Sequence, residues 1–186
     1  MSLPRRAQRA RHSIEGLERT VLDTENEPVA AVAKVRVLVA DDDPAFIEVL
    51  RALFAFDERF EVVGEAGNGE QAVALASELA PDVVALDIVM PLMDGIEATR
   101  LIRERRPDCR VVLVSGSIFQ ERTGKGAEVA QLAGASAYVL KSRAVLELAD
   151  TVHAVALSTT TDFVVLGPDG LTAILDEQSF RSYRVS

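Results

Sequence analysis

The chain has 186 residues, 48% of them hydrophobic and 26% charged, and its formal net charge is −9. A chain of this length can bury one good core and still carry extensions, and its acidic balance predicts no direct binding to nucleic acid. No apolar stretch approaches the about 18 uninterrupted residues of a membrane span, so we expect no insertion into a membrane. The single cysteine, Cys109, excludes an intramolecular disulfide and suits a reducing compartment, which predicts a cytoplasmic protein.

The first 33 residues predict an extension rather than a domain. A basic run lies between Arg5 and Arg11, and Ile14, Leu17 and Val21 then fall on one possible helical face. We expect either a flexible, solvated tail or a short amphipathic helix that docks on a partner or on the rest of the chain. The segment lacks the apolar core that a signal peptide needs.

Residues 34–157 alternate between Val-rich apolar runs and helical patterns. Continuous apolar runs of this kind are typical of parallel strands that are buried on both faces of a sheet. Right-handed crossovers between such strands give a three-layer α/β sandwich with helices on both faces. The strands are predicted at 35–40, 61–65, 82–87, 110–115 and 136–140, and the helices at 45–56, 69–80, 95–106, 121–133 and 143–157.

The last segment, residues 158–186, is predicted to form a short tail. It opens with the polar sequence STTTD and continues with FVVLGPDGLTAIL, in which a Pro-Asp-Gly turn separates two apolar runs. That pattern predicts a hairpin. We expect the tail to be too short for a helix-turn-helix domain, so the sequence does not reveal a DNA-binding module in this segment.

Polar side chains stand where the predicted strands end. The acidic run Asp41–Asp43 directly follows the first strand, and Asp87 closes the third. Ser115 ends the fourth strand and Lys141 follows the fifth. Because open α/β sheets bind their ligands at the carboxyl ends of the strands, we expect these side chains to form one site.

This set of side chains suits a divalent cation and a phosphoryl group. Mg²⁺ prefers oxygen ligands and is commonly held by one or two carboxylates together with phosphate. Two carboxylates about 4 Å apart repel by roughly 4 kcal/mol at an effective dielectric of about 20, and a bound cation reverses that sign. A carboxylate can also attack phosphorus and form an aspartyl phosphate, provided that a cation and donors such as Lys141 and Ser115 neutralise the oxygens.

Taken singly, these residues have simpler structural explanations. A lone Asp before a turn is usually a cap, so Asp41–Asp43 could merely cap the first helix, and Asp94 is predicted to be a turn and N-cap residue. Lys141 alone would be a surface lysine. The functional interpretation depends on four matched strand ends in the right order.

Four stretches of the chain resemble the receiver domain of two-component response regulators: VRVLVADDDP, ALDIVMPLMDG, VVLVSG and GASAYVLKS. They are spread over roughly residues 34–157. The resemblance implies a flavodoxin-like α/β fold with a five-stranded parallel sheet in the order 2-1-3-4-5. It also implies a phosphorelay, in which a histidine kinase or phosphotransfer protein is the donor and a downstream protein or a homodimer is the output.

The same resemblance implies a role for each residue at the strand ends. The ligands of Mg²⁺ would be Asp41, Asp42, Asp87 and the backbone carbonyl of Val89, with Asp43 a weaker candidate beside them. The reacting and switching groups would be Asp87 as the phosphoacceptor, Lys141 as the phosphate-contacting lysine, Ser115 as the switch hydroxyl and Tyr138 as the switch aromatic.

Two departures from the family pattern bear on the switch. The interval between Ser115 and Lys141 is longer than receivers usually have, and the excess lies in GSIFQERTGKG, so we expect the switching segment to differ from the family's. Val89 brings an apolar branched side chain to a position where many relatives carry a polar one. We therefore expect Val89 to alter the lifetime of the acyl phosphate.

Three classes of function remain open on the sequence. The favoured one is a receiver that accepts a phosphoryl group on its own Asp87 and is not a turnover enzyme. A Mg²⁺ phosphohydrolase with an aspartyl nucleophile is disfavoured, because that family needs a second Asp where this chain has Val89. The third is a receiver-like interaction module that works without phosphorylation.

Overall fold

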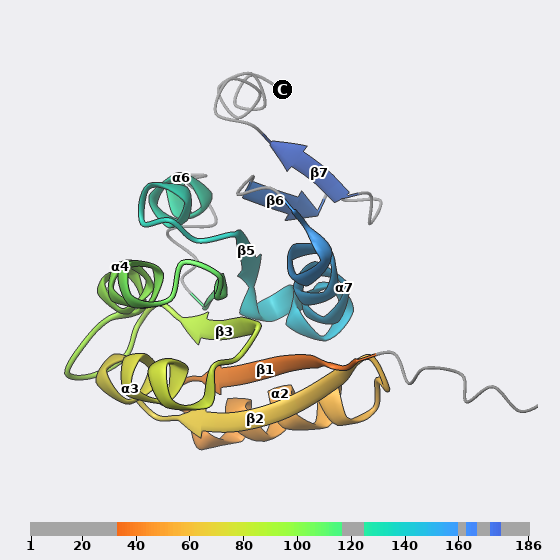
Figure 1. Ribbon diagram of the computed structural model, residues 1–186, viewed down its shortest axis with the longest axis horizontal. Helices are drawn as coiled ribbons and strands as arrows, with labels where there is room; N and C mark the ends of the chain where they lie inside the picture. Colours follow the sequence, from red (N-terminus) through yellow and green to blue (C-terminus); the bar gives the residue numbers. More distant parts are fainter. Residues whose placement is uncertain (1–32, 117–124, 160–162, 167–171, 176–186) are drawn as a thin grey trace, which may run out of the picture. The chain divides into compact units, whose positions relative to one another are not determined.

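The computed structural model describes residues 33–116, 125–159, 163–166 and 172–175 (Figure 1). Almost all of the predicted N-terminal extension lies outside these residues, as does the Pro-Asp-Gly turn predicted in the tail. Within the described part of the chain, no helix is long and apolar enough to cross a bilayer.

The strands and helices alternate along the chain as predicted, and the ends that can be compared differ by no more than one residue. The first part of the helix predicted at 121–133 lies outside the described residues. The strands are β1 (Val35–Ala40), β2 (Phe60–Ala66), β3 (Val83–Asp87), β4 (Arg110–Ser115), β5 (Ala137–Leu140), β6 (Phe163–Leu166) and β7 (Thr172–Leu175). The helices are α2 (Pro44–Ala55), α3 (Gly69–Leu79), α4 (Gly95–Arg105), α6 (Lys125–Leu132) and α7 (Ala144–Leu157), with the 3₁₀ turn η1 (Lys141–Arg143) before α7.

The described strands form one sheet in the order β2-β1-β3-β4-β5-β6-β7. The first five strands are all parallel, which confirms the predicted order 2-1-3-4-5. The sheet is longer than the five strands expected. β6 adds to the outer edge of β5 in parallel, through the pair Ala137 and Val164, and β7 pairs antiparallel with β6.

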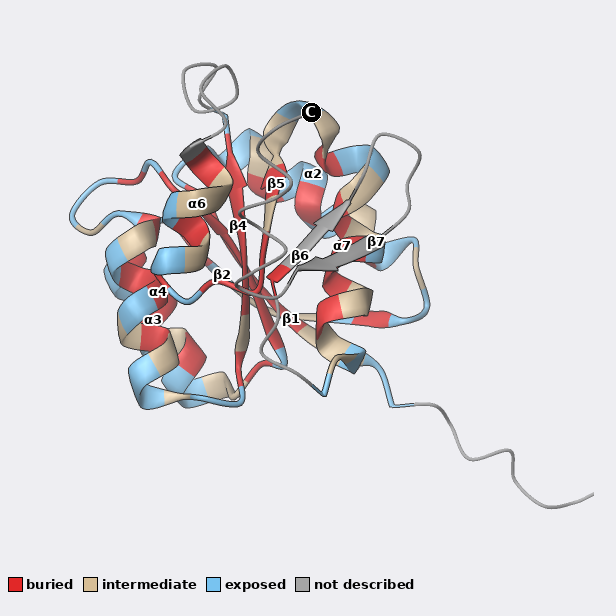
Figure 2. Cartoon of the chain, turned by 90° about the horizontal axis from the view of Figure 1, so that it is seen from above, coloured by how far each residue is buried: buried red, intermediate tan, exposed pale blue. Residues whose placement is uncertain are grey.

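Two apolar clusters cover the two faces of the sheet, which makes the three layers. Successive residues of a strand point to opposite faces, so Val37 and Val39 of β1 pack on one side while Leu38 packs on the other. The first cluster lies between the sheet and α3, α4 and α6, and the second lies between the sheet and α2 and α7. Figure 2 shows the buried residues running along the central strands between these helices.

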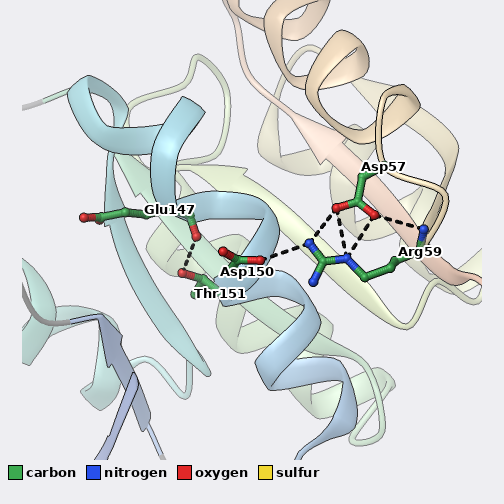
Figure 3. A network of polar contacts seen from close by, with 5 residues as sticks. All are labelled: Asp57, Arg59, Glu147, Asp150 and Thr151. Carbon is green, nitrogen blue, oxygen red and sulfur yellow. Dashed lines mark hydrogen bonds and ion pairs between the residues drawn. The ribbon is translucent and has the colours of Figure 1, made fainter. Parts of the chain in front are cut away.

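Helix α7 is held to the turn between α2 and β2 by a polar network (Figure 3). Arg59 in that turn contacts Asp57 and also Asp150 of α7, with nitrogen–oxygen distances of 2.5 and 3.0 Å. The hydrogen bond from Arg59 is the main reason why the pKa of Asp57 is lowered. The ring centroid of His153 in α7 lies 6.1 Å from that of Phe60 at the start of β2.

Side-chain caps begin the helices that follow β1, β2 and β3. Asp43 accepts a hydrogen bond from the amide of Ala45 at 2.9 Å, and Asn68 accepts one from Gln71 at the same distance. Asp94 caps α4 by accepting from the amide of Glu97 at 2.8 Å, as predicted. Such caps satisfy amide groups that have no partner in the first helical turn, and they direct the chain away from the strand ends.

The start of α4 lies against the end of β3 so closely that only glycine fits. The Gly95 amide donates to the carbonyl of Ile88 at 2.9 Å, and a Cβ added to Gly95 would lie 2.0 Å from the carbonyl oxygen of Asp87. The packing of α4 therefore determines where the backbone of Asp87 can lie.

We predict that Gly95→Ala lowers the free energy of unfolding by about 1–3 kcal/mol or more, because the added methyl group must push α4 away from β3. Gly67→Ala is the matched control, since a Cβ there would meet only the Gln71 side chain at 3.7 Å. Urea denaturation of both variants measures the difference. Equal stability of the two variants would contradict this account of Gly95.

Candidate functional site

Three carboxylates from two strand ends meet at one edge of the sheet. Ala40 of β1 pairs with Leu86 of β3, so the next residues, Asp41 and Asp87, follow neighbouring strands at the same level. Asp41 is 2% exposed and Asp87 is 4% exposed, whereas Asp42 is open to solvent. One carboxylate oxygen from each of the three lies within 4.8 Å of the others.

Lys141 brings a positive charge between the two buried carboxylates. It begins η1 directly after β5, and its Nζ lies 2.6 Å from Asp41 Oδ2 and 3.1 Å from Asp87 Oδ2. Partial burial would lower the pKa of Lys141, but the contacts with Asp41 and Asp87 outweigh that cost and raise it. Lys141 is therefore a permanent cation at neutral pH.

Backbone amides hold the second oxygen of each buried carboxylate. The amide of Ile88 donates to Asp87 Oδ1 at 2.9 Å, and the amide of Asp43 donates to Asp41 Oδ1 at 2.9 Å. These contacts orient both carboxylates with their other oxygens toward Lys141. The pKa of Asp87 is nevertheless raised, first by burial and then by the charge of Asp41, with Lys141 and the Ile88 amide acting in the opposite direction.

The donor set fits Mg²⁺. The acidic triad, by which we mean Asp41, Asp42 and Asp87, offers hard oxygen ligands with one exposed member toward solvent, as suits a cation that keeps part of its water shell. Three carboxylates and the one ammonium of Lys141 leave two negative charges at the site, which one divalent cation would balance. Asp43, the weaker candidate, is not part of this triad, because its side chain caps α2.

The structure places the other predicted residues around this triad. Ser115 ends β4, is 1% exposed, and pairs in register with Leu140, the residue before Lys141. Val89, in the loop after β3, is 66% exposed. Tyr138 of β5 packs against the first apolar cluster, and a Cβ added to Gly126 of α6 would lie 2.6 Å from its hydroxyl oxygen. The tip of Tyr138 therefore fits under α6 only because residue 126 is glycine.

One residue of the site was not identified from the sequence as functional. The Nζ of Lys141 lies 4.7 Å from the ring centroid of Phe46, a distance at which the ring attracts the ammonium. Phe46 falls within the helix predicted at 45–56, and an apolar residue in a helix does not by itself indicate a functional role. The sequence feature that could have identified Phe46 is its position in the first turn of the helix after the acidic run, because that position lies beside the strand ends.

A family model for the response regulator receiver domain matches residues 37–153. The chain therefore belongs to the response regulator receiver family, which is the class that the sheet order and the acidic triad define.

Individual relatives agree with this assignment. The transcriptional regulatory protein LiaR of Bacillus subtilis is 38% identical over 120 residues, which make up 64% of this chain and 55% of LiaR. A two-component response regulator of the LuxR family from Aurantimonas is 29% identical with a TM-score of 0.65, and the match covers 83% of this chain and all of that one. One chain of a CheX-CheY-BeF3-Mg complex from Borrelia burgdorferi is 28% identical to this chain, with a TM-score of 0.59. That match covers 66% of this chain and 90% of the other.

We predict that Asp87→Asn raises the melting temperature at neutral pH without added metal. A carboxyl group whose pKa is raised in the folded state favours folding in its protonated form, and this contribution is lost as the pH rises through the folded pKa. The neutral amide avoids that loss and its oxygen can still accept from Ile88. Thermal melting from pH 7 downward measures the effect, and the advantage of the variant should shrink as Asp87 becomes protonated in the wild type.

Added Mg²⁺ provides the control for this prediction. It should stabilise the wild type more than Asp87→Asn, because the variant loses one anionic ligand. A variant that melts below the wild type at neutral pH without metal would contradict the predicted strain.

Proposed function

We propose that this chain receives a phosphoryl group on Asp87 within a two-component signalling system. The observation that carries the proposal is the placement of Lys141 against both Asp41 and Asp87, in a buried acidic cluster at the strand ends. The donor would be the phosphohistidine of a histidine kinase or of a phosphotransfer protein in the cytoplasm. Asp87 itself would be phosphorylated and later dephosphorylated, so we propose that the chain is not an enzyme that turns over a separate substrate.

The transfer requires Asp87 in its ionised form. One carboxylate oxygen attacks phosphorus, and the new O–P bond forms while the P–N bond of the phosphohistidine breaks and its nitrogen takes the electron pair. The hydrogen bond from Ile88 to Asp87 Oδ1 fixes the plane of the carboxylate during this step. The product is an acyl phosphate on Asp87.

The surrounding residues neutralise the charge that the phosphoryl group brings. Lys141 already faces Asp87 Oδ2 at 3.1 Å and would contact the phosphoryl oxygens, and Ser115 would donate its hydroxyl to them. Mg²⁺, held by Asp41, Asp42, Asp87 and the carbonyl of Val89, would supply the remaining positive charge. The exposed side chain of Val89 would influence how water reaches the acyl phosphate.

The phosphoryl group would act on the rest of the domain through Ser115 and Tyr138. It adds about 1.5 to 2 negative charges and three hydrogen-bond acceptors. Movement of Ser115 toward it would open space for the ring of Tyr138, and this would reshape the face formed by α6, β5 and α7. Such couplings are typically about 1 to 3 kcal/mol, which is enough to change a partner's affinity without refolding the domain.

The output of the chain is proposed to be a protein contact. The net charge of −9 supports a protein partner or a second copy of the chain over direct binding to DNA. LiaR is described as a transcriptional regulatory protein, but this chain spans only 55% of its length. The beryllofluoride in the Borrelia complex makes that ion a reasonable probe for the phosphorylated state here.

We predict that acetyl phosphate with Mg²⁺ adds one phosphoryl group to the wild type, as measured by intact mass. Asp87→Asn should give no adduct, and removal of the metal with a chelator should abolish the adduct of the wild type. Asp94→Asn is the matched control, because Asp94 is a helix cap outside the triad and asparagine caps equally well. A wild type that stays unmodified would favour the interaction module that needs no phosphorylation.

We also predict a role for Phe46 in this reaction. Phe46→Leu should slow adduct formation by about two- to fivefold, because an exposed cation–π contact is worth about 0.5–1 kcal/mol and a factor of ten in rate corresponds to about 1.4 kcal/mol. Phe46→Tyr keeps an aromatic ring beside Lys141 and should restore the rate. The time course of the intact mass measures both variants, and equal rates for leucine and tyrosine would show that only packing matters.

A further inference from the structure

The outer edge of β5 is occupied by a strand from the same chain. After α7, the carbonyl of Ser158 accepts a hydrogen bond from Arg110 Nη2 at 3.1 Å, which ties the end of the helix to the start of β4. The chain then returns as β6, parallel to β5, and continues as β7 (Figure 1). We call β6 and β7 together the C-terminal strand pair.

Phe163 connects this strand pair to the part of the core that contains Tyr138. Phe163 is 1% exposed and belongs to the first apolar cluster, and Tyr138 packs against the same cluster. The register agrees with this placement. Ala137 of β5 pairs with Val164 of β6, and successive residues of a strand point to opposite faces of the sheet. Tyr138, which follows Ala137, and Phe163, which precedes Val164, therefore point to the same face.

The connection between β5 and β6 is the least extensive in the described sheet. Among the residues that the structure describes, one pair is in register between β5 and β6, whereas four pairs join β4 to β5 and four join β6 to β7. The strand pair is therefore more strongly bonded within itself than to the receiver. Phe163 is buried in the same cluster against which Tyr138 packs, so a change in that cluster can shift the strand pair.

We propose that the C-terminal strand pair is an internal ligand of the face formed by α6, β5 and α7, and that phosphorylation weakens its attachment. The proposal rests on the function proposed above. Movement of Tyr138 into the space near Ser115 takes the ring away from the cluster that buries Phe163. The outer edge of β5 then becomes available to an extended segment of a partner protein, which would add to the sheet in the place that β6 occupies.

Hydrogen–deuterium exchange of the full chain, with and without Mg²⁺ and beryllofluoride, tests the proposal. The amides of β6 that are directed at β5, rather than at β7, should exchange at least about fivefold faster in the loaded protein, since allosteric couplings commonly change an equilibrium about 5- to 150-fold. The ¹⁹F resonance of bound beryllofluoride shows independently that the site is loaded.

Reciprocity supplies a second measurement. If loading lowers the affinity of the receiver for the strand pair by some factor, then the attached strand pair lowers the affinity for beryllofluoride by the same factor. Phe163→Ala should therefore bind beryllofluoride with Mg²⁺ more tightly than the wild type, and Phe163→Leu should show a smaller change in the same direction. Phe56→Ala is the matched control, because Phe56 ends α2 with 92% of its surface exposed and should leave the affinity unchanged.

The possible results separate this proposal from the one on which it rests. Unchanged or slower exchange of β6 in a chain that shows the bound ¹⁹F resonance would overturn the internal ligand and leave the role of Asp87 intact. Absence of that resonance would overturn both. Equal effects of Phe163→Ala and Phe56→Ala on the affinity would also overturn the internal ligand.

Discussion

The buried carboxylates Asp41 and Asp87 impose the constraint on which the site depends. Two acids that are almost fully buried side by side are costly unless positive charge lies between them. Lys141 provides one such charge at hydrogen-bonding distance from both, and backbone amides hold the remaining oxygens. The three carboxylates still exceed the one ammonium, and this excess of negative charge suits the site to a divalent cation.

The fold positions these charges with little freedom. Parallel pairing brings the ends of β1, β3, β4 and β5 to one edge, and the helices that follow β1 and β3 begin at the caps Asp43 and Asp94. Gly95 allows α4 to lie directly on the carbonyl of Asp87, and Gly126 allows α6 to lie on the tip of Tyr138. The two glycines thus allow close contact at Asp87, the proposed phosphoacceptor, and at Tyr138, the residue proposed to transmit the change.

In the mechanism proposed above, the C-terminal strand pair is an output element within the same chain. A partner that needs the edge of β5 must compete with β6, which pairs with β5 through Ala137 and Val164 and buries Phe163 in the core. Competition of this kind converts a small movement in the core into a change of accessible surface. Helix α7 packs against the second apolar cluster, on the other face of the sheet from Phe163 and Tyr138, and Asp150 of α7 contacts Arg59.

Much of this protein was determined by its sequence alone. The alternation of continuous Val-rich runs with helical patterns predicted five strands and their helices to within one residue at the ends that can be compared. The strand ends also predicted that Asp41, Asp42, Asp87 and Lys141 would meet, because local patterns decide where a strand stops and parallel pairing brings those stops together. Only the tertiary structure decided that Asp43 is a cap, that Phe46 faces Lys141, and that β6 extends the sheet beside β5. These features depend on contacts between distant segments and on which way each side chain turns, and no periodicity along the chain encodes that information.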